Sequence, residues 1–141
     1  MIKGLIAAEQ GPRQPEPARP PLVLVVDDSA DIRELLRLHL SDAGYRVVTA
    51  EDAVAAGHCV TRELPGLIIA DFKMPYMNGV DFIAALRADA TIPDIPVIFI
   101  TDTDATPELT GKTFGFPLLT KPVLADKLLA TVAAQLATGR R

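Results

Sequence analysis

Short apolar runs without polar alternation recur along this chain, and segments with helical spacing lie between most of them. The run at 22–26 is typical of a strand that is buried on both faces of a parallel sheet. Further strands are predicted at 45–49, 66–70, 96–100 and 116–120. Helices are predicted between a cap at Ser29 or Asp31 and Gly44, near 52–62, over 80–88 and near 124–137. This alternation implies right-handed crossovers and a mainly parallel sheet covered on both faces, so the sequence predicts an α/β domain.

The two ends of the chain differ from this pattern. Residues 12–21 hold five of the twelve prolines, a composition that favours an extended segment. The full length of 141 residues is within the usual size of one domain. We therefore expect a proline-rich flexible tail over 1–21, one domain over 22–138 and a short tail over 139–141.

Charge and cysteine content limit the classes of function. Outside 1–21 and 140–141 the chain keeps 9 of its 14 basic and 16 of its 18 acidic side chains, which is a net charge of −7. Nucleic-acid affinity depends on clustered Lys and Arg, so direct DNA binding is not expected. No apolar stretch approaches the ~20 residues that span a bilayer, so membrane insertion is not expected either. Cys59 is the only cysteine, which fits a reducing, cytoplasmic location.

Polar and charged residues stand at the ends of the predicted strands. Asp27 and Asp28 end the first strand, Asp71 the third, Thr101 the fourth, and Lys121 comes directly after the last. In open α/β sheets, sites form beyond the carboxyl ends of the strands. Three carboxylates, a hydroxyl and an ammonium group are therefore expected to converge on one edge of the sheet.

Each of these residues also has a purely structural interpretation. One of the two acidic residues Asp27 and Asp28 could cap a helix, but capping needs only one carboxylate. Two carboxylates that face Asp71 would repel it unless one is protonated or a cation is held, and an all-oxygen set suits Mg²⁺. Lys121 could be a solvated surface residue, or it could pair with a carboxylate or a phosphoryl oxygen, to which the Thr101 hydroxyl could also donate. Together the positions favour a phosphoryl-aspartate site.

At these positions the sequence resembles the response-regulator receivers of two-component signalling. The resemblance covers about residues 22–137 and implies a flavodoxin-like, doubly wound sheet of five parallel strands in the order 2-1-3-4-5. The matching positions are the phosphoacceptor motif at 71–79, the acidic pair Asp27-Asp28, the switch hydroxyl of Thr101 and the terminal Lys121-Pro122.

The resemblance implies a role for each residue of the site. Asp71 would be the nucleophile that takes a phosphoryl group from a phosphohistidine. Asp28, Asp71 and the Lys73 carbonyl would bind Mg²⁺ directly, and Asp27 would act through water. Mg²⁺ would neutralise the crowded oxygens, since phosphoryl transfer depends mostly on positioning and charge stabilisation. Beyond self-catalysed acceptance and autodephosphorylation, no enzyme activity is expected.

By the same resemblance, the Lys121-Pro122 peptide bond is expected to be cis, which is physically accessible before proline. The fourth helix is expected to be short or irregular, because Pro107 and Gly111 interrupt the segment between Thr101 and Lys121.

The expected switching residues depart from the family pattern. Leu118 stands where the family commonly has Tyr or Phe, so Phe114 or Phe116 would have to substitute in part. Asp102 stands where a small residue usually follows the threonine, and Lys73 is expected to offset its charge partly, which leaves phosphorylation possible with an altered lifetime. The residues predicted to tune or switch the site are Asp102, Thr103, Leu118 and Pro122.

The function favoured by these residues is a stand-alone phosphorylation switch that signals by protein contact. A sensor histidine kinase or a histidine phosphotransfer protein would act upstream, and a target protein would meet the face of the fourth helix, fifth strand and fifth helix. One alternative is a receiver that binds its partner irrespective of phosphorylation. Another is a Mg²⁺-dependent phosphohydrolase, although Lys73 stands where such an enzyme needs a second acid. For His39, His58 and Cys59, packing or partial exposure is the simpler interpretation.

Overall fold

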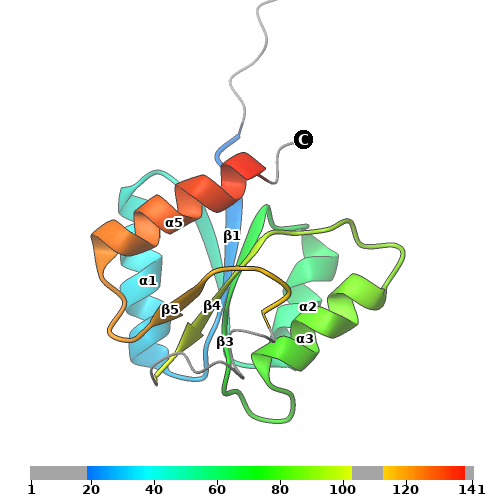
Figure 1. The fold of residues 1–141 in the computed structure, drawn as a ribbon. Coiled ribbons are helices and arrows are strands. Elements are labelled where there is room, and N and C mark those ends of the chain that lie inside the picture. The colour runs from blue at the N-terminus through cyan, green and yellow to red at the C-terminus, as the bar shows by residue number, and fades with distance from the viewer. Residues whose placement is uncertain (1–18, 103–112, 139–141) are drawn as a thin grey trace, which may run out of the picture.

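The computed structural model describes residues 19–102 and 113–138 (Figure 1). The strands are β1 (Leu22–Val26), β2 (Arg46–Ala50), β3 (Leu67–Asp71), β4 (Val97–Thr101) and β5 (Leu118–Thr120). The helices are α1 (Ala30–Asp42), α2 (Ala53–Arg62), α3 (Gly79–Ala88) and α5 (Ala125–Thr138). All strand pairs are parallel and follow the order β2-β1-β3-β4-β5, which confirms the predicted sheet. Residues 1–18 of the predicted tail over 1–21, the predicted tail over 139–141 and most of the segment expected to form the fourth helix lie outside the described residues.

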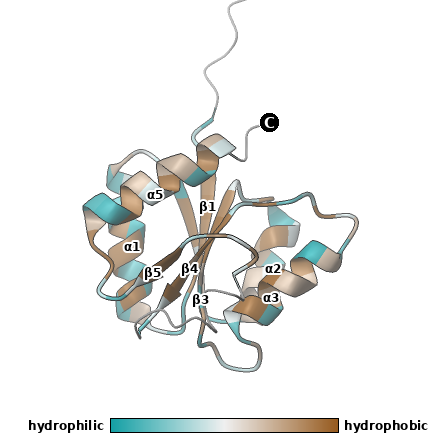
Figure 2. Cartoon of the chain, viewed as in Figure 1, coloured by the Kyte–Doolittle hydropathy of each residue, from teal (hydrophilic) through white to brown (hydrophobic). Residues whose placement is uncertain are grey.

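The central strands β1, β3 and β4 are buried on both faces because nearly all of their residues are apolar. Leu24 and Val26 of β1 point into a cluster with residues of α2 and α3. Val23 and Val25 point the other way, into a cluster with residues of α1 and α5. Figure 2 shows the strands as largely hydrophobic between helices whose outward faces are more hydrophilic. The lack of alternation in the first apolar run therefore reflects two separate cores, as predicted.

Local capping fixes where the helices begin. The Ser29 hydroxyl accepts a hydrogen bond from the Ile32 N–H at 3.3 Å, so Ser29 is the cap of α1 rather than Asp31. Asp52 and Asn78 cap α2 and α3 in the same way. Each helix thus starts directly beyond the carboxyl end of a strand, which places all these helix starts at one edge of the sheet.

The last strand is shorter than predicted. The range 116–120 was expected, but β5 begins at Leu118. The Phe116 N–H donates to the Thr113 carbonyl in a turn, and Pro117 has no N–H to give to a neighbouring strand. The other predicted strands agree with the structure to within one residue, and Asp71 and Thr101 are the last residues of β3 and β4.

Among the described helices, none is both long and apolar enough to cross a bilayer. His58 is exposed, whereas His39 and Cys59 are half-buried. In the described part of the chain, the one group of three or more His, Cys, Asp or Glu side chains close enough to share a metal ion is Asp27, Asp28 and Asp71.

Candidate functional site

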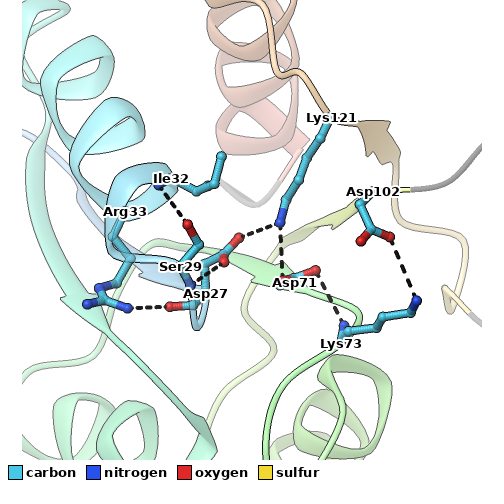
Figure 3. Close-up of polar contacts among 8 residues, drawn as sticks. All are labelled: Asp27, Ser29, Ile32, Arg33, Asp71, Lys73, Asp102 and Lys121. Carbon is cyan, nitrogen blue, oxygen red and sulfur yellow. Dashed lines mark hydrogen bonds and ion pairs between the residues drawn. The ribbon is translucent and has the colours of Figure 1, made fainter.

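Four charged side chains from three strands meet at the carboxyl edge of the sheet, and we call them the acidic edge: Asp27, Asp28, Asp71 and Lys121. Asp27 and Asp28 follow β1, Asp71 ends β3, and Lys121 follows β5. Carboxylate oxygens of the three aspartates lie within 4.8 Å of one another. Figure 3 shows Lys121 reaching from above to both Asp27 and Asp71. The predicted convergence of these residues is therefore present in the structure.

Asp27 is fully buried and held from several sides. Its Oδ1 accepts a hydrogen bond from the Ser29 N–H at 2.9 Å, and its main-chain carbonyl accepts one from Arg33 Nη1 at 2.7 Å (Figure 3). Its Oδ2 accepts no hydrogen bond of good geometry among the described residues, although the Lys121 ammonium lies 3.1 Å away as an ion pair. A buried carboxylate oxygen thus keeps capacity for a further positive ligand.

Asp71 is buried as well, and both of its oxygens are positioned. Oδ1 accepts from the Lys73 N–H, and Oδ2 accepts from Lys121 Nζ, each at 3.3 Å. Burial raises the pKa of the Asp71 carboxyl to about 6, the neighbouring Asp27 charge adds to the rise, and Lys121 opposes it. A second cation at this edge would therefore favour the ionised form of Asp71.

Lys121 bridges the two buried aspartates, and only 18% of its side chain is exposed. Burial alone would lower the pKa of its ammonium group, but the contacts with Asp27 and Asp71 outweigh burial and raise that pKa. Lys121 therefore stays charged. The peptide bond from Lys121 to Pro122 is cis, as predicted.

The donor set fits Mg²⁺. Three carboxylates face one ammonium group, so the acidic edge keeps an excess of negative charge. All the donors are oxygens, which Mg²⁺ prefers, and Asp27 Oδ2 has capacity to spare. Asp28 is exposed and leaves the edge open to solvent. The ligand role of the Lys73 carbonyl stays a prediction.

Comparisons with known proteins agree with this geometry. A family model described as the response regulator receiver domain matches residues 23–133. The chain belongs to the response-regulator receiver family. Receivers generally bind Mg²⁺ at a cluster of acidic residues, and this receiver has such a cluster.

Individual relatives support the assignment. The receiver is 36% identical over 123 residues to the response regulator Rre1 of Synechocystis sp., which covers 85% of this chain and 53% of that protein. It is 33% identical over 119 residues to the phosphate regulon regulator PhoB of Pseudomonas aeruginosa. That match covers 81% of this chain and 51% of PhoB. The chain thus spans about half the length of these curated relatives. The chemotaxis protein CheY4 of Vibrio cholerae has the same fold, with a TM-score of 0.77, 32% identity, and coverage of 82% of this chain and 98% of that one.

The phosphoacceptor motif of the receiver folds back onto Asp71. The Gly79 N–H donates to the Phe72 carbonyl at 3.0 Å, and a Cβ at Gly79 would overlap the Asp71 carbonyl oxygen. Phe72 is buried, and its ring lies 5.3 Å from the ring of Phe99 on β4. Gly79 is required here because the loop returns to within contact of the residue from which it started.

Sequence reasoning missed the conformation of Tyr76 within this motif. The Met77 N–H donates to the Pro75 carbonyl at 2.8 Å, and Tyr76 between them has a φ of +72°. These features describe a γ-turn with a left-handed central residue, which is rare and strained. A left-handed conformation costs a non-glycine residue roughly 1–2 kcal/mol. The sequence carries no signal for it, because a residue type other than Gly, Asn or Asp gives no reason to expect positive φ.

The remaining predicted residues surround the acidic edge. Thr101 is buried at the end of β4, and its carbonyl accepts from the Lys121 N–H at 2.8 Å. Asp102 Oδ1 lies 3.9 Å from Lys73 Nζ, so the expected pairing of these charges is present, although both side chains are largely exposed (Figure 3). Leu118 is half-buried and packs against the core cluster beside α2 and α3. The predicted tuning residue Thr103 lies outside the described residues.

Proposed function

We propose that this receiver accepts a phosphoryl group on Asp71 from the phosphohistidine of a sensor histidine kinase or histidine phosphotransfer protein, with the help of Mg²⁺. The observation that carries the proposal is the environment of Asp71. Its carboxylate is buried beside two further carboxylates, and Lys121 and the Lys73 N–H hold one oxygen each. A buried aspartate that is held by an ammonium group and a main-chain N–H is suited to accept a phosphoryl group, whose negative oxygens need such donors.

In the proposed transfer, an Asp71 carboxylate oxygen forms a bond to phosphorus while the bond from phosphorus to the histidine nitrogen breaks. The imidazole nitrogen leaves with the electron pair. When bound, Mg²⁺ supplies positive charge to the transferring oxygens and the crowded carboxylates. Lys121 would then pair with a phosphoryl oxygen in place of the Asp71 oxygen it now contacts, and it keeps its contact with Asp27.

Asp27 and Lys73 contribute by holding the nucleophile and its neighbours in place. The Ser29 N–H holds the Asp27 carboxylate, and Arg33 holds the Asp27 main-chain carbonyl, so both the side chain and the backbone of Asp27 are positioned beside Lys121. The Lys73 N–H fixes the orientation of the Asp71 carboxylate. Pre-set geometry of this kind removes an entropic barrier to transfer.

The test is labelling with acetyl phosphate, followed by mass measurement of the intact protein. The wild type should gain one phosphoryl group in the presence of Mg²⁺ and none after chelation. Asp71→Asn should gain none, and Asp28→Asn should need a higher Mg²⁺ concentration. Asp94→Asn, an exposed aspartate at the other end of the sheet, is the matched control and should label like the wild type. Equal labelling of Asp71→Asn and wild type would exclude the proposal.

The wider role is part of the same proposal. The receiver would act without an enzymatic activity on other substrates, in the cytoplasm, and would signal by contact with a target protein near β5 and α5. Leu118 has neither a ring nor a hydroxyl group, which favours as a second candidate a receiver whose partner binding does not depend on phosphorylation. Equal binding of the partner by wild type and Asp71→Ala would support that second function.

A further inference from the structure

The tip of the loop between β3 and α3 presents apolar side chains to solvent, and we define it as Pro75, Tyr76 and Met77. Tyr76 has 90% of its residue surface exposed, and Met77 is also exposed. Figure 1 shows this loop projecting beyond the carboxyl end of β3. A large aromatic side chain is therefore held in water at the same edge as the buried Asp71.

The backbone of Tyr76 has a positive φ, and the packing of its ring does little to offset the cost of that conformation. At a φ of +72°, glycine would be unstrained, whereas tyrosine is strained. With 90% of the residue surface exposed, the ring has little packing against the described chain that could offset the strain. The turn hydrogen bond from Met77 to Pro75 accounts for the positive φ but not for the tyrosine side chain. A large aromatic side chain kept where glycine would be unstrained indicates a role in contact with something outside the chain.

The position of the loop limits what that contact can be. Both ends of the loop lie at Asp71, because Gly79 closes against the Asp71 carbonyl and donates to Phe72. The tip is therefore within roughly 17 Å of Asp71, the reach of five extended residues. Since Asp71 is buried, a protein that delivers a phosphoryl group to it must lay its surface over the surrounding loops.

We infer that Tyr76 is a specificity-determining contact for the protein phosphodonor, and this inference rests on the proposed function. The ring packs on an apolar patch beside the phosphohistidine of that donor. Tyrosine is among the residue types that most often dominate the binding energy of protein interfaces. Leu124, three residues beyond Lys121, is also exposed and gives the same edge a second apolar group. The fitting donor therefore has a phosphohistidine bordered by apolar side chains, not a uniformly charged surface.

The experiment compares a small and a large donor on the same variants. Acetyl phosphate tests Asp71 itself, and a panel of radiolabelled histidine kinase domains, screened for transfer to wild type, tests protein contact. Tyr76→Gly removes the ring and suits the backbone, so its thermal midpoint should be unchanged or higher. Leu64→Ala, an exposed apolar residue before the amino end of β3, is the matched control.

We expect Tyr76→Gly to lower kcat/KM for the kinase domain at least tenfold, chiefly through KM, and to leave acetyl phosphate labelling within twofold of wild type. Leu64→Ala should match wild type with both donors. The inference is overturned if Tyr76→Gly keeps wild-type transfer rates with both donors, or if it loses transfer equally with both. Transfer from no kinase domain to wild type, with normal acetyl phosphate labelling, would overturn it and leave the acceptor chemistry standing. Failure of wild type to label with either donor would overturn the proposed function itself.

Discussion

The acidic edge and the segment before β5 are both held by contacts between distant parts of the chain, but the contacts differ in kind. At the acidic edge, Lys121 lies 3.1 Å from Asp27 and 3.3 Å from Asp71, and both aspartates are buried. Before β5, the Arg87 guanidinium lies 5.2 Å from the ring centre of Phe114 and 5.7 Å from that of Phe116. We call these last three residues the β5 flank.

The two regions therefore respond differently to change. Buried charges interact strongly and cannot be satisfied by water. The loss of one charge therefore leaves the remaining buried charges without a partner. An exposed cation over aromatic rings contributes little and can be replaced by solvent. Phe114 has a positive φ, as Tyr76 does, but its ring is stacked against Arg87. Substitutions at the acidic edge should thus change stability strongly, whereas substitutions at the β5 flank should change it little.

The largest expected effect is the loss of the bridging charge at the acidic edge. Lys121→Ala should destabilise the protein by about 2–4 kcal/mol at neutral pH without Mg²⁺, because it leaves two buried carboxylates facing each other. Urea unfolding would measure the loss, and Lys127→Ala, an exposed lysine on α5, is the control. Adding Mg²⁺ or lowering the pH should recover part of it. Equal stability of the two variants would show that the acidic edge is not charge-coupled.

The next effect has the opposite sign. The pKa of Asp71 is raised to about 6, so the native state holds a proton that the unfolded chain loses near pH 4. Wild-type stability should therefore fall as the pH rises from about 4 to 6 and change little from this source above that. Asp71→Asn does not titrate, so it should be more stable than wild type by about 1–3 kcal/mol at pH 7.

Thermal unfolding at several pH values without Mg²⁺ would check this expectation. The advantage of Asp71→Asn should vanish below about pH 4 and shrink when Mg²⁺ is added. Asp94→Asn, which is exposed, should follow wild type throughout. A difference between Asp71→Asn and wild type that does not vary with pH would contradict the assigned cause.

A smaller effect is expected at the β5 flank. Arg87→Gln removes the guanidinium from both rings and should cost about 0.5–1 kcal/mol. Amide exchange at Phe116, whose N–H donates to Thr113, should become faster, whereas exchange in β1 should not change. Arg37→Gln, which breaks only an exposed pair with Glu34, is the control. Unchanged exchange at Phe116 would show that Arg87 does not hold this segment.

The smallest effect is expected for the exposed pair at the rim of the acidic edge. Lys73 and Asp102 are 3.9 Å apart and largely exposed. A double-mutant cycle with Lys73→Gln and Asp102→Asn should give a coupling energy below about 0.5 kcal/mol, and it should vanish at high salt. A coupling above about 1 kcal/mol would mean that the rim is as tightly coupled as the buried aspartates.

The apolar pattern and the residues at the strand ends were enough to predict the sheet and the members of the acidic edge. Apolar runs without alternation require burial on both faces, and strands connected by helices run parallel. Parallel strands end at one edge, so Asp27, Asp71 and Lys121 had to meet there once their strands were placed. The start of β5 was predicted two residues early, since residues 116–119 are apolar and the turn at Thr113 leaves little trace in the sequence.

The contacts among these residues, in contrast, are set by the packing of the whole fold. That Lys121 bridges Asp27 and Asp71 depends on distances between three strands, which local periodicity does not encode. The left-handed φ of Tyr76 depends on the closure of Gly79 onto Asp71, and the position of Phe114 depends on a side chain of α3. Patterns along a chain specify which residues are buried and at which strand end they lie, but contacts between segments far apart in sequence are set only when the whole fold packs.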